Sequence, residues 1–264
     1  MDIKEINHST QINAPFRNVH KTATGILLLV NGLLFVITII FQTYGIDLAD
    51  IGGLHFFLAK DFHLYQFLSY LFLHANLRHI ISNLLFLWIF GLIVEKAWGP
   101  KKFVVYYMIC GIVGGIIQEI AQLGQFYMTI SAEDPSVAFG EIFSIGHQLS
   151  EQLNAWTTIG SSGAVGAVIL AFGLLFSEKL IYSIKVKWLI ISYVIIDVLS
   201  LICSFGNGGV FAAQLGAMIC GFIMMKCWKS DKEPTDSDDK MTEWGMKLLL
   251  VAVGIKVVYL AMYF

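Results

Sequence analysis

The feature that most constrains this chain is a recurring run of about 20 apolar residues, the length that crosses the roughly 30 Å hydrocarbon core of a bilayer as an α-helix. Only 14 % of the residues are charged, against roughly 25 % in a typical soluble domain. We therefore expect an all-α, polytopic (multi-pass) integral membrane protein. The predicted spans are 24–44, 76–94, 103–123, 157–177, 187–205, 208–228 and 244–264.

Positive charges mark alternate ends of these spans, and cytoplasmic loops carry an excess of Lys and Arg. The charges that flank the spans on one side are Lys4, Arg17, Lys21, Lys96, Lys101, Lys102, Lys179, Lys185, Lys187, Lys226, Lys229, Lys232 and Lys240. On the other side, residues 45–75 hold Lys60, and residues 124–156 hold no Lys or Arg. This pattern predicts a cytoplasmic N-terminus and a C-terminus on the outer side. The compact core and short loops fit a bacterial inner membrane.

The predicted organisation has one membrane domain and one additional helix. Its four parts are a cytoplasmic N-terminal segment (1–23), a membrane domain (24–228), a charged cytoplasmic linker (229–243) and a seventh transmembrane helix (244–264). The first segment is polar and mixed in charge, so we expect no cleavable signal peptide. Lys247 and Lys256 interrupt the seventh span, nine residues apart and on opposite faces.

Two outer segments, 46–73 and 124–156, are long enough to hold structure of their own. The first is rich in aromatic residues, which suits a segment that lies in the membrane interface. The second contains a stretch that can form an amphipathic helix. The alternative for both is a loop packed on the top of the helix bundle, and the sequence leaves the two interpretations open.

Several function classes find no support in the sequence. Cys110, Cys203, Cys220 and Cys227 all lie in or at the ends of spans and form no CxxC pair, so neither a disulfide framework nor a zinc site is expected. No nucleotide-binding loop is present, and the basic residues flank spans rather than cluster for nucleic acid. We expect no metal, no cofactor and no nucleic-acid partner. The sequence gives no indication of oligomeric state.

Polar residues inside the spans are the candidate functional residues, because each must be compensated or useful there. His79 and Asn83 lie four residues apart, on one face of the second span, with His74 in the preceding turn. Ser162 lies about five residues inside the outer end of the fourth span, and Gln214 about six residues inside that of the sixth. At 1.5 Å per residue, both are expected roughly 8–10 Å below the outer surface, where the two could face each other.

Small residues on the fourth and sixth spans let these helices approach closely. They are Gly160, Gly163, Gly166, Gly216 and Gly221. A structural interpretation stays open for each polar residue by itself. A serine in a transmembrane helix usually bonds its own i−4 carbonyl, and a lone amide often joins helices through one bond of about 1 kcal/mol.

Four ordered segments resemble the rhomboid family of intramembrane serine proteases, over nearly the whole membrane domain. "YQFLSYLFLHANLRHIISNLLFLWIFG" resembles the segment that enters that family's second helix. "VEKAWGPKKFVVYYMICG" resembles the following turn and third helix. "GSSG" resembles the G-x-S-G nucleophile motif, and "AAQLGAMICG" resembles the sixth-helix pattern of Ala-His, small residues and Gly. The seventh span resembles a C-terminal addition to a six-helix core.

The resemblance implies a role for each candidate residue. Ser162 corresponds to the nucleophile, and His79 and Asn83, with the backbone N–H of Ser162, correspond to the oxyanion donors. Gly160 and Gly163 would let the substrate backbone approach, and His74 would support the site. The implied partners are the bilayer and transmembrane segments of other membrane proteins.

Two positions depart from the family pattern. Tyr65-Gln66 stands where the family often has Trp-Arg in the first outer loop. Gln214 stands where the general-base histidine is expected. A carboxamide can bond the Ser162 hydroxyl, but it has no basic form near neutral pH to accept its proton. His147, fifteen residues before Ser162, is an alternative base only if its loop folds over the site.

Three hypotheses follow. The first is an inactive rhomboid-type protein that binds transmembrane segments without cleaving them. The second is a working intramembrane serine protease in which the change at Gln214 is compensated, or was introduced into this chain. The third is an unrelated bundle such as a transporter component, which the absence of paired, Gly/Pro-interrupted helices disfavours.

Overall fold

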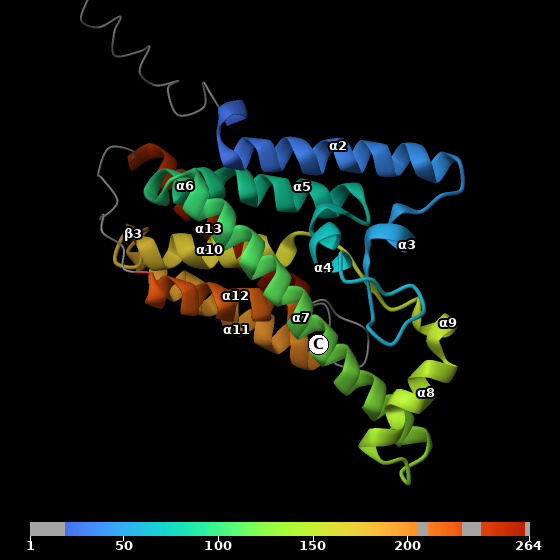
Figure 1. Cartoon of the computed structure of the whole chain (residues 1–264). Helices are drawn as coiled ribbons and strands as arrows, with labels where there is room; N and C mark the ends of the chain where they lie inside the picture. The colour runs from blue at the N-terminus through green and yellow to red at the C-terminus, as the bar shows by residue number, and fades with distance from the viewer. Residues whose placement is uncertain (1–18, 205–210, 229–238, 262–264) are drawn as a thin grey trace, which may run out of the picture.

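The computed structural model describes residues 19–204, 211–228 and 239–261 (Figure 1). Most of the predicted N-terminal segment, the start of the sixth span, most of the predicted linker and the last three residues lie outside the described residues. The same holds for Lys4, Arg17, Lys229 and Lys232, and for the side chains of Lys240 and Cys203. The parts of the predictions that fall on these residues stay predictions.

The long elements are helices, as the apolar runs predict. They are α2 (Ala23–Thr43), α5 (Leu77–Phe86), the π-helical η3 (Leu87–Gly91), α6 (Leu92–Trp98), α7 (Pro100–Glu133), α10 (Ser162–Leu175), α11 (Val186–Ser204), α12 (Phe211–Cys227) and α13 (Asp239–Ala261). Three of the described helices are long and apolar enough to cross a membrane: α2, the continuous helix formed by α5, η3 and α6, and α7. The described parts of α10 and α12 are shorter apolar helices. The all-α, membrane-type fold class is thus confirmed.

Short elements occupy the ends of the bundle. They are η1 (Val19–Lys21), α3 (Leu48–Gly52), β1 (Leu54–His55), α4 (Gln66–Ser69), η2 (Tyr70–Phe72), η4 (Phe139–Glu141), α8 (Ile142–Gln148), α9 (Ser150–Leu153), β2 (Thr157–Thr158), β3 (Leu180–Ile181) and β4 (Ile184–Lys185). β1 pairs with β2 and β3 with β4, both antiparallel.

Several predicted span ends differ from the helix ends, and two of these differences have a clear structural cause. Helix α7 does not end at residue 123 but continues to Glu133, because Phe126 finds apolar partners in the outer segments and is buried there. Helix α10 begins at Ser162 rather than at 157. The residues before it are extended, since Thr157 and Thr158 form β2.

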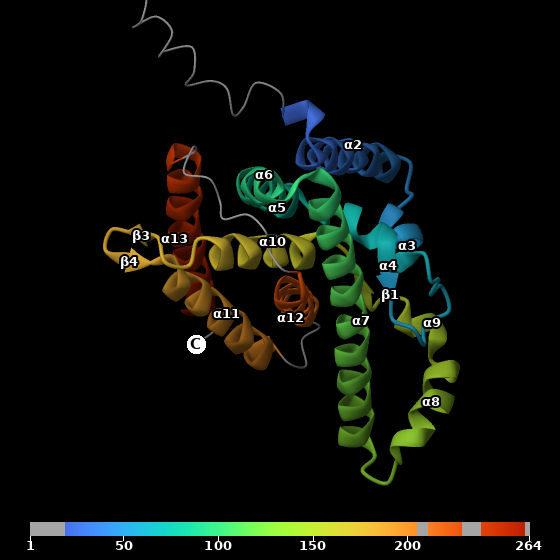
Figure 2. The same cartoon turned by 60° about the vertical axis from the view of Figure 1, so that its left-hand side comes forward.

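Helix α12 lies between α7 and α10, and α11 and α13 pack together beside them (Figure 2). On the other side of α10, α2 runs along α5 and α6, and α7 crosses the group obliquely (Figure 1). The largest fully buried side chains are aromatic and come from several elements: Phe56, Tyr70, Phe90, Phe103, Tyr106, Tyr107 and Phe172. This packing holds the described helices in one body.

The buried carboxylate of Glu95 anchors the first helix. Its two oxygens accept hydrogen bonds from the backbone N–H of Ala23 at 2.8 Å and of Thr24 at 2.7 Å, and from the Thr24 hydroxyl at 2.6 Å. The first N–H groups of a helix have no intrahelical acceptor and carry partial positive charge. Glu95, at the end of the second span, therefore fixes where α2 begins.

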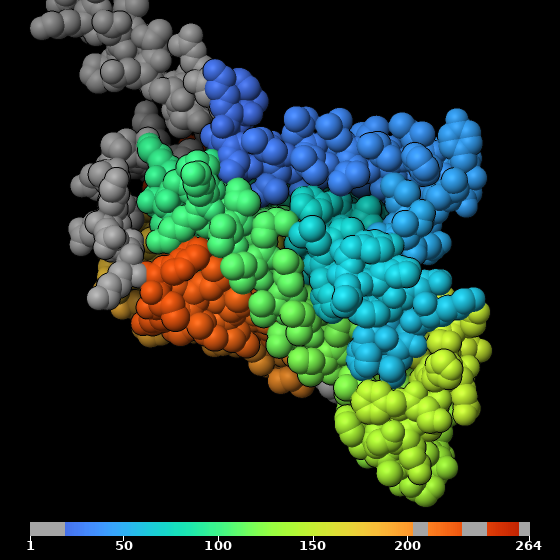
Figure 3. Space-filling model, viewed as in Figure 1, coloured from blue at the N-terminus to red at the C-terminus, as the bar shows by residue number. Residues whose placement is uncertain are grey.

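The two outer segments pack against each other and against the far end of α7. A second apolar cluster joins them, with Phe56, Phe126, Ile142 and Leu153 at its centre. In the space-filling view, α8 and α9 form a lobe that projects beyond the other helices (Figure 3). Residues 124–156 thus include short helices, as one of the two interpretations expected, and both outer segments are packed together through this cluster.

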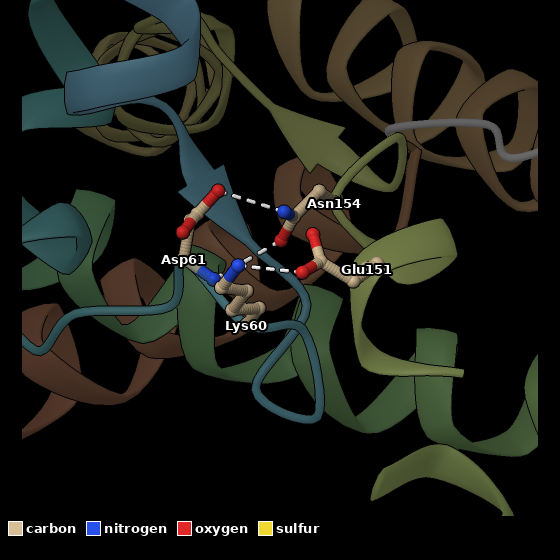
Figure 4. Close-up of polar contacts among 4 residues, drawn as sticks. All are labelled: Lys60, Asp61, Glu151 and Asn154. Carbon is tan, nitrogen blue, oxygen red and sulfur yellow. Dashed lines mark hydrogen bonds and ion pairs between the residues drawn. The ribbon is translucent and has the colours of Figure 1, made fainter. Parts of the chain in front are cut away.

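Polar contacts set the register between the two outer segments (Figure 4). Lys60 Nζ lies 2.5 Å from Glu151 Oε1. Asn154 donates to Asp61 Oδ2 at 2.7 Å and accepts from the Asp61 backbone N–H at 3.0 Å. Exposed ion pairs contribute little stability each. We therefore assign these contacts to the alignment of β1 with β2, the strand that precedes α10.

Gln66 organises the turn before the second span. Its side chain is fully buried, and its oxygen accepts from the backbone N–H of His63 at 3.0 Å and of His55 at 3.3 Å. Its amide donates to the carbonyl of Asp61 at 2.9 Å and, more weakly, to that of Ile51 at 3.4 Å. Gln66 departs from the Trp-Arg pattern of the family, but its carboxamide suits this position because it both donates and accepts hydrogen bonds.

We predict that Gln66→Ala lowers the free energy of unfolding by about 2–4 kcal/mol, because it leaves buried backbone donors and acceptors without partners. Thermal unfolding in detergent micelles measures the effect. The matched control is Gln152→Ala, since Gln152 is an exposed glutamine on α9, in the outer lobe. Equal effects of the two substitutions would contradict the assigned role of Gln66.

Candidate active site

Ser162 is the first residue of α10, which corrects the predicted position one turn inside a helix. The first intrahelical hydrogen bond runs from Val165 N to Ser161 O, at 2.9 Å. The backbone N–H groups from Ser162 to Ala164 therefore have no intrahelical acceptor, and they carry the positive end of the helix dipole. A developing oxyanion beside Ser162 would meet donors there.

His79 lies against the chain just before Ser162. The side chain of Asn76 caps α5 and accepts from the His79 backbone N–H at 2.9 Å. A Cβ added at Gly160 would come within 2.5 Å of His79 Cε1 and 2.7 Å of His79 Nε2. Gly160 also has a φ of +119°, a conformation that L side chains rarely adopt. Only glycine at position 160 allows the His79 imidazole to approach the segment before α10 so closely.

Asn83 lies one turn after His79 on α5, and its side chain is buried. Its amide nitrogen Nδ2 has no hydrogen-bond acceptor among the described residues. Buried polar groups usually have partners, so this nitrogen is a donor that remains available. The predicted pairing of His79 and Asn83 on one helix face fits this geometry.

His74 lies in the turn between η2 and α5, as predicted, and is buried. Its Nε2 is 3.3 Å from the hydroxyl of Ser161, the residue before Ser162. Its ring meets the His79 ring edge to face, with 5.1 Å between centroids. Burial lowers the pKa of His74 to about 4, and the neighbouring His79 adds to this. A neutral His74 therefore supports the nucleophile segment through Ser161.

The backbone at Ala213 is held from two sides. Cβ atoms added at Gly114 of α7 and Gly163 of α10 would lie 2.6 Å and 3.2 Å from the Ala213 carbonyl oxygen. The Ala213 backbone N–H donates to the side chain of Gln118, at 3.1 Å. These contacts fix the turn of α12 that carries the next residue, Gln214.

The side chain of Gln214 packs on α10, one turn beyond Ser162. A Cβ added at Gly166 would lie 3.0 Å from Gln214 Cγ and 3.2 Å from Nε2. The amide donates to the Tyr193 hydroxyl of α11 at 2.8 Å. No hydrogen bond joins it to Ser162 in the described part of the chain. The expected bond from Gln214 to the nucleophile is therefore replaced by one to Tyr193.

The structure thus brings the segments that carry all seven predicted site residues together around the start of α10, while His147 lies apart. That histidine is exposed on α8, in the outer lobe. Within the described ranges, no three His, Cys, Asp or Glu side chains gather in a way that could hold a metal ion. The chemical roles of the site residues stay predictions.

Sequence reasoning missed three residues that shape this site: Ser161, Gln118 and Tyr193. Ser161 stands in the nucleophile motif itself, and Gln118 is a polar residue inside a predicted span. Both residues could have been identified from the sequence, because a polar group inside a predicted span needs a partner. Tyr193 could not, because one tyrosine in an apolar helix does not indicate which residue its hydroxyl meets.

Comparisons with known proteins identify the family to which the sequence is similar. Residues 61–229 match the family model described as the rhomboid domain. The chain is 31 % identical over 97 residues to rhomboid-like protease 3 of Toxoplasma gondii, covering 36 % of this chain and 37 % of that protein. It is 36 % identical over 97 residues to the chloroplastic rhomboid-like protein 11 of Arabidopsis thaliana, covering 33 % and 32 %.

A third relative is rhomboid protease GlpG of Salmonella newport, with 34 % identity over 58 residues that cover 22 % of this chain and 21 % of that protein. The matched stretches thus span between 21 % and 37 % of the lengths of these three relatives.

We predict that Gly160→Ala lowers the free energy of unfolding by about 1–3 kcal/mol, the cost of a strained backbone position, and displaces the His79 ring. Thermal unfolding measures the first effect, and the imidazole NMR signal of His79 the second. Gly124→Ala is the control, since its Cβ meets no atom within 4 Å. An unchanged His79 signal in Gly160→Ala would contradict the described packing.

Proposed function

The chain belongs to the rhomboid family, and we propose that it uses this family's intramembrane protease fold to bind transmembrane segments of other membrane proteins without hydrolysing them. The observation that carries the proposal is Gln214, which stands at the base position and donates its amide to Tyr193. Serine hydrolysis needs a group that takes the hydroxyl proton and later gives it to the leaving amine. A carboxamide does neither near neutral pH.

The rest of the site supports binding of a peptide backbone. The unbonded N–H groups at the start of α10 and the buried Asn83 amide are donors, and peptide carbonyls are acceptors. Gly160 and Gly163 contribute indirectly, because they leave room for the His79 ring and the Ala213 carbonyl beside the nucleophile motif. A transmembrane segment that unwinds locally would satisfy its freed carbonyls there, which the hydrocarbon cannot do.

No neighbouring histidine is free to replace the base in the described contacts. His74 faces Ser161 rather than Ser162, and His79 lies against Gly160. The second candidate function, a working serine endopeptidase, therefore requires a rearrangement that brings another proton acceptor to Ser162. Loss of one member of a catalytic triad lowers the rate by factors of about 10⁴–10⁶.

The topology is part of the proposal. Residues 24–228 form the membrane domain, and 244–264 add a seventh span beyond the linker 229–243. Segment 1–23 lies in the cytoplasm, because Lys and Arg flank the spans on that side. The membrane is a bacterial inner membrane. Reporter fusions at the two ends and in the outer lobe test this orientation.

We predict that Gln214→His raises cleavage of a generic rhomboid-type transmembrane substrate by about 10⁴-fold or more, the range that a restored triad member supplies. Four purified proteins are compared in liposomes: this chain, Ser162→Ala, Gln214→His, and Gln214→His with Ser162→Ala. The expected result is cleavage by Gln214→His alone. Cleavage by this chain that disappears with Ser162→Ala would overturn the proposal, because another base would then serve Ser162.

Binding is tested separately by energy transfer from a labelled transmembrane substrate to the labelled chain in the same liposomes. An unrelated single-span helix is the control. Preferential association with the substrate segment supports the proposal, and equal association of both segments contradicts it. A fluorophosphonate that labels Ser162 in Gln214→His reports whether the nucleophile can react, independently of the substrate chosen.

A further inference from the structure

An ion pair lies inside the helix bundle, where charged groups are costly. Lys256 of α13 pairs with Asp197 of α11, and their side chains are 22 % and 1 % exposed. Each residue stands near the middle of a predicted span. Charged residues at the centre of a transmembrane helix cost about 2.5–3.5 kcal/mol each on insertion scales, and those that occur usually have a function.

The pair is connected to the candidate site through one tyrosine. The Lys256 ammonium lies 3.7 Å from the centroid of the Tyr193 ring. Tyr193 precedes Asp197 by four residues, so both project from the same face of α11. The Tyr193 hydroxyl in turn accepts the hydrogen bond from Gln214. A continuous chain of polar contacts thus runs from α13, through α11, to α12.

Helix docking by itself does not account for this chain of contacts. Replacing a buried ion pair by apolar side chains of similar volume often leaves stability unchanged or raises it, so apolar residues would hold α13 in place at least as well. A cation over the face of an aromatic ring, by contrast, restricts where that ring lies. The restricted ring fixes its hydroxyl, and the hydroxyl fixes the amide of Gln214.

We propose that Lys256 and Asp197 are positioning residues for the side chain at position 214, acting through Tyr193. Helix α13 is then a working part of the candidate site rather than an appendage. The inference rests on the proposed function in one respect: the proposed function identifies position 214 as the place where the general base would stand. In this chain the network holds the amide on Tyr193, beside Gly166 and away from Ser162.

The side-chain amide NMR signal of Gln214 tests the proposal, using the full chain labelled with ¹⁵N-glutamine in micelles. Gln214→Met assigns the signal. In Lys256→Met with Asp197→Leu, we expect the signal to shift and its exchange with water to become about fivefold faster, the factor that one ordinary hydrogen bond supplies. Tyr193→Phe removes only the acceptor hydroxyl, and we expect the same change.

The control is Lys247→Met with Glu243→Gln, which removes an exposed ion pair of 2.6 Å on the same helix and should leave the Gln214 signal unchanged. The proposal is overturned if the Lys256 and Asp197 double variant leaves the signal unchanged, because the ion pair then only docks α13. It is also overturned if Tyr193→Phe leaves the signal unchanged, even where the double variant does not fold.

This readout needs no cleavage, so it separates the two proposals. If this chain itself cleaves in a way that Ser162→Ala abolishes, but the amide signal responds as expected, the network stands and the proposed function is at fault. If the amide signal does not respond and Gln214→His cleaves, the proposed function stands and the positioning role of Lys256 and Asp197 is wrong.

Discussion

The structure depends on the close approach of α12 to the two helices on either side of it. In a bilayer, lipid tails are as apolar as the helix surfaces, so helices associate through packing and polar contacts rather than through hydrophobic burial. Gly114 of α7 and Gly163 of α10 both face the Ala213 carbonyl, and no side chain larger than hydrogen fits at Gly114 without a shift. This contact sets the position of the turn that carries Gln214. The position of this turn places the Gln214 side chain on α10, next to the nucleophile motif.

The same environment explains why so many polar side chains act as connectors. A backbone group in or near hydrocarbon must find a partner inside the protein. Glu95 provides partners for the start of α2, Gln66 for the turn before the second span, and Gln118 for the start of α12. Each of these side chains fixes a boundary between elements. The candidate site is built at boundaries of this kind, at the starts of α5 and α10 and near the start of α12.

Gln214 illustrates that the packing of a position and its chemistry are separate requirements. Its amide is locally well accommodated, because Gly166 leaves space for it and the Tyr193 hydroxyl accepts its hydrogen bond. The requirement for a base acts on the reaction and not on the fold, so a residue that satisfies the packing need not satisfy the chemistry. The buried pair of Lys256 and Asp197 is linked to this position, since the Lys256 ammonium lies over the ring of Tyr193, whose hydroxyl accepts the hydrogen bond from the Gln214 amide.

The sequence by itself determined the membrane class and the order of the helices, and it named the candidate site residues whose roles stay predictions. These follow from apolar length and from short motifs, and both are local properties of the chain. Ser162, His79, Asn83 and Gln214 could be named because the G-x-S-G pattern and the four-residue spacing survive without knowledge of contacts.

The tertiary structure decided where helices begin and which groups meet. Helix α10 starts at Ser162 because β1 pairs with β2 across about 100 residues of sequence, and α7 extends to Glu133 because the outer lobe covers Phe126. The partner of Gln214 is Tyr193, and that of Lys256 is Asp197. Such pairs depend on how whole helices rotate and cross, and no local pattern encodes that, because crossing is set by the sum of many weak contacts between distant residues.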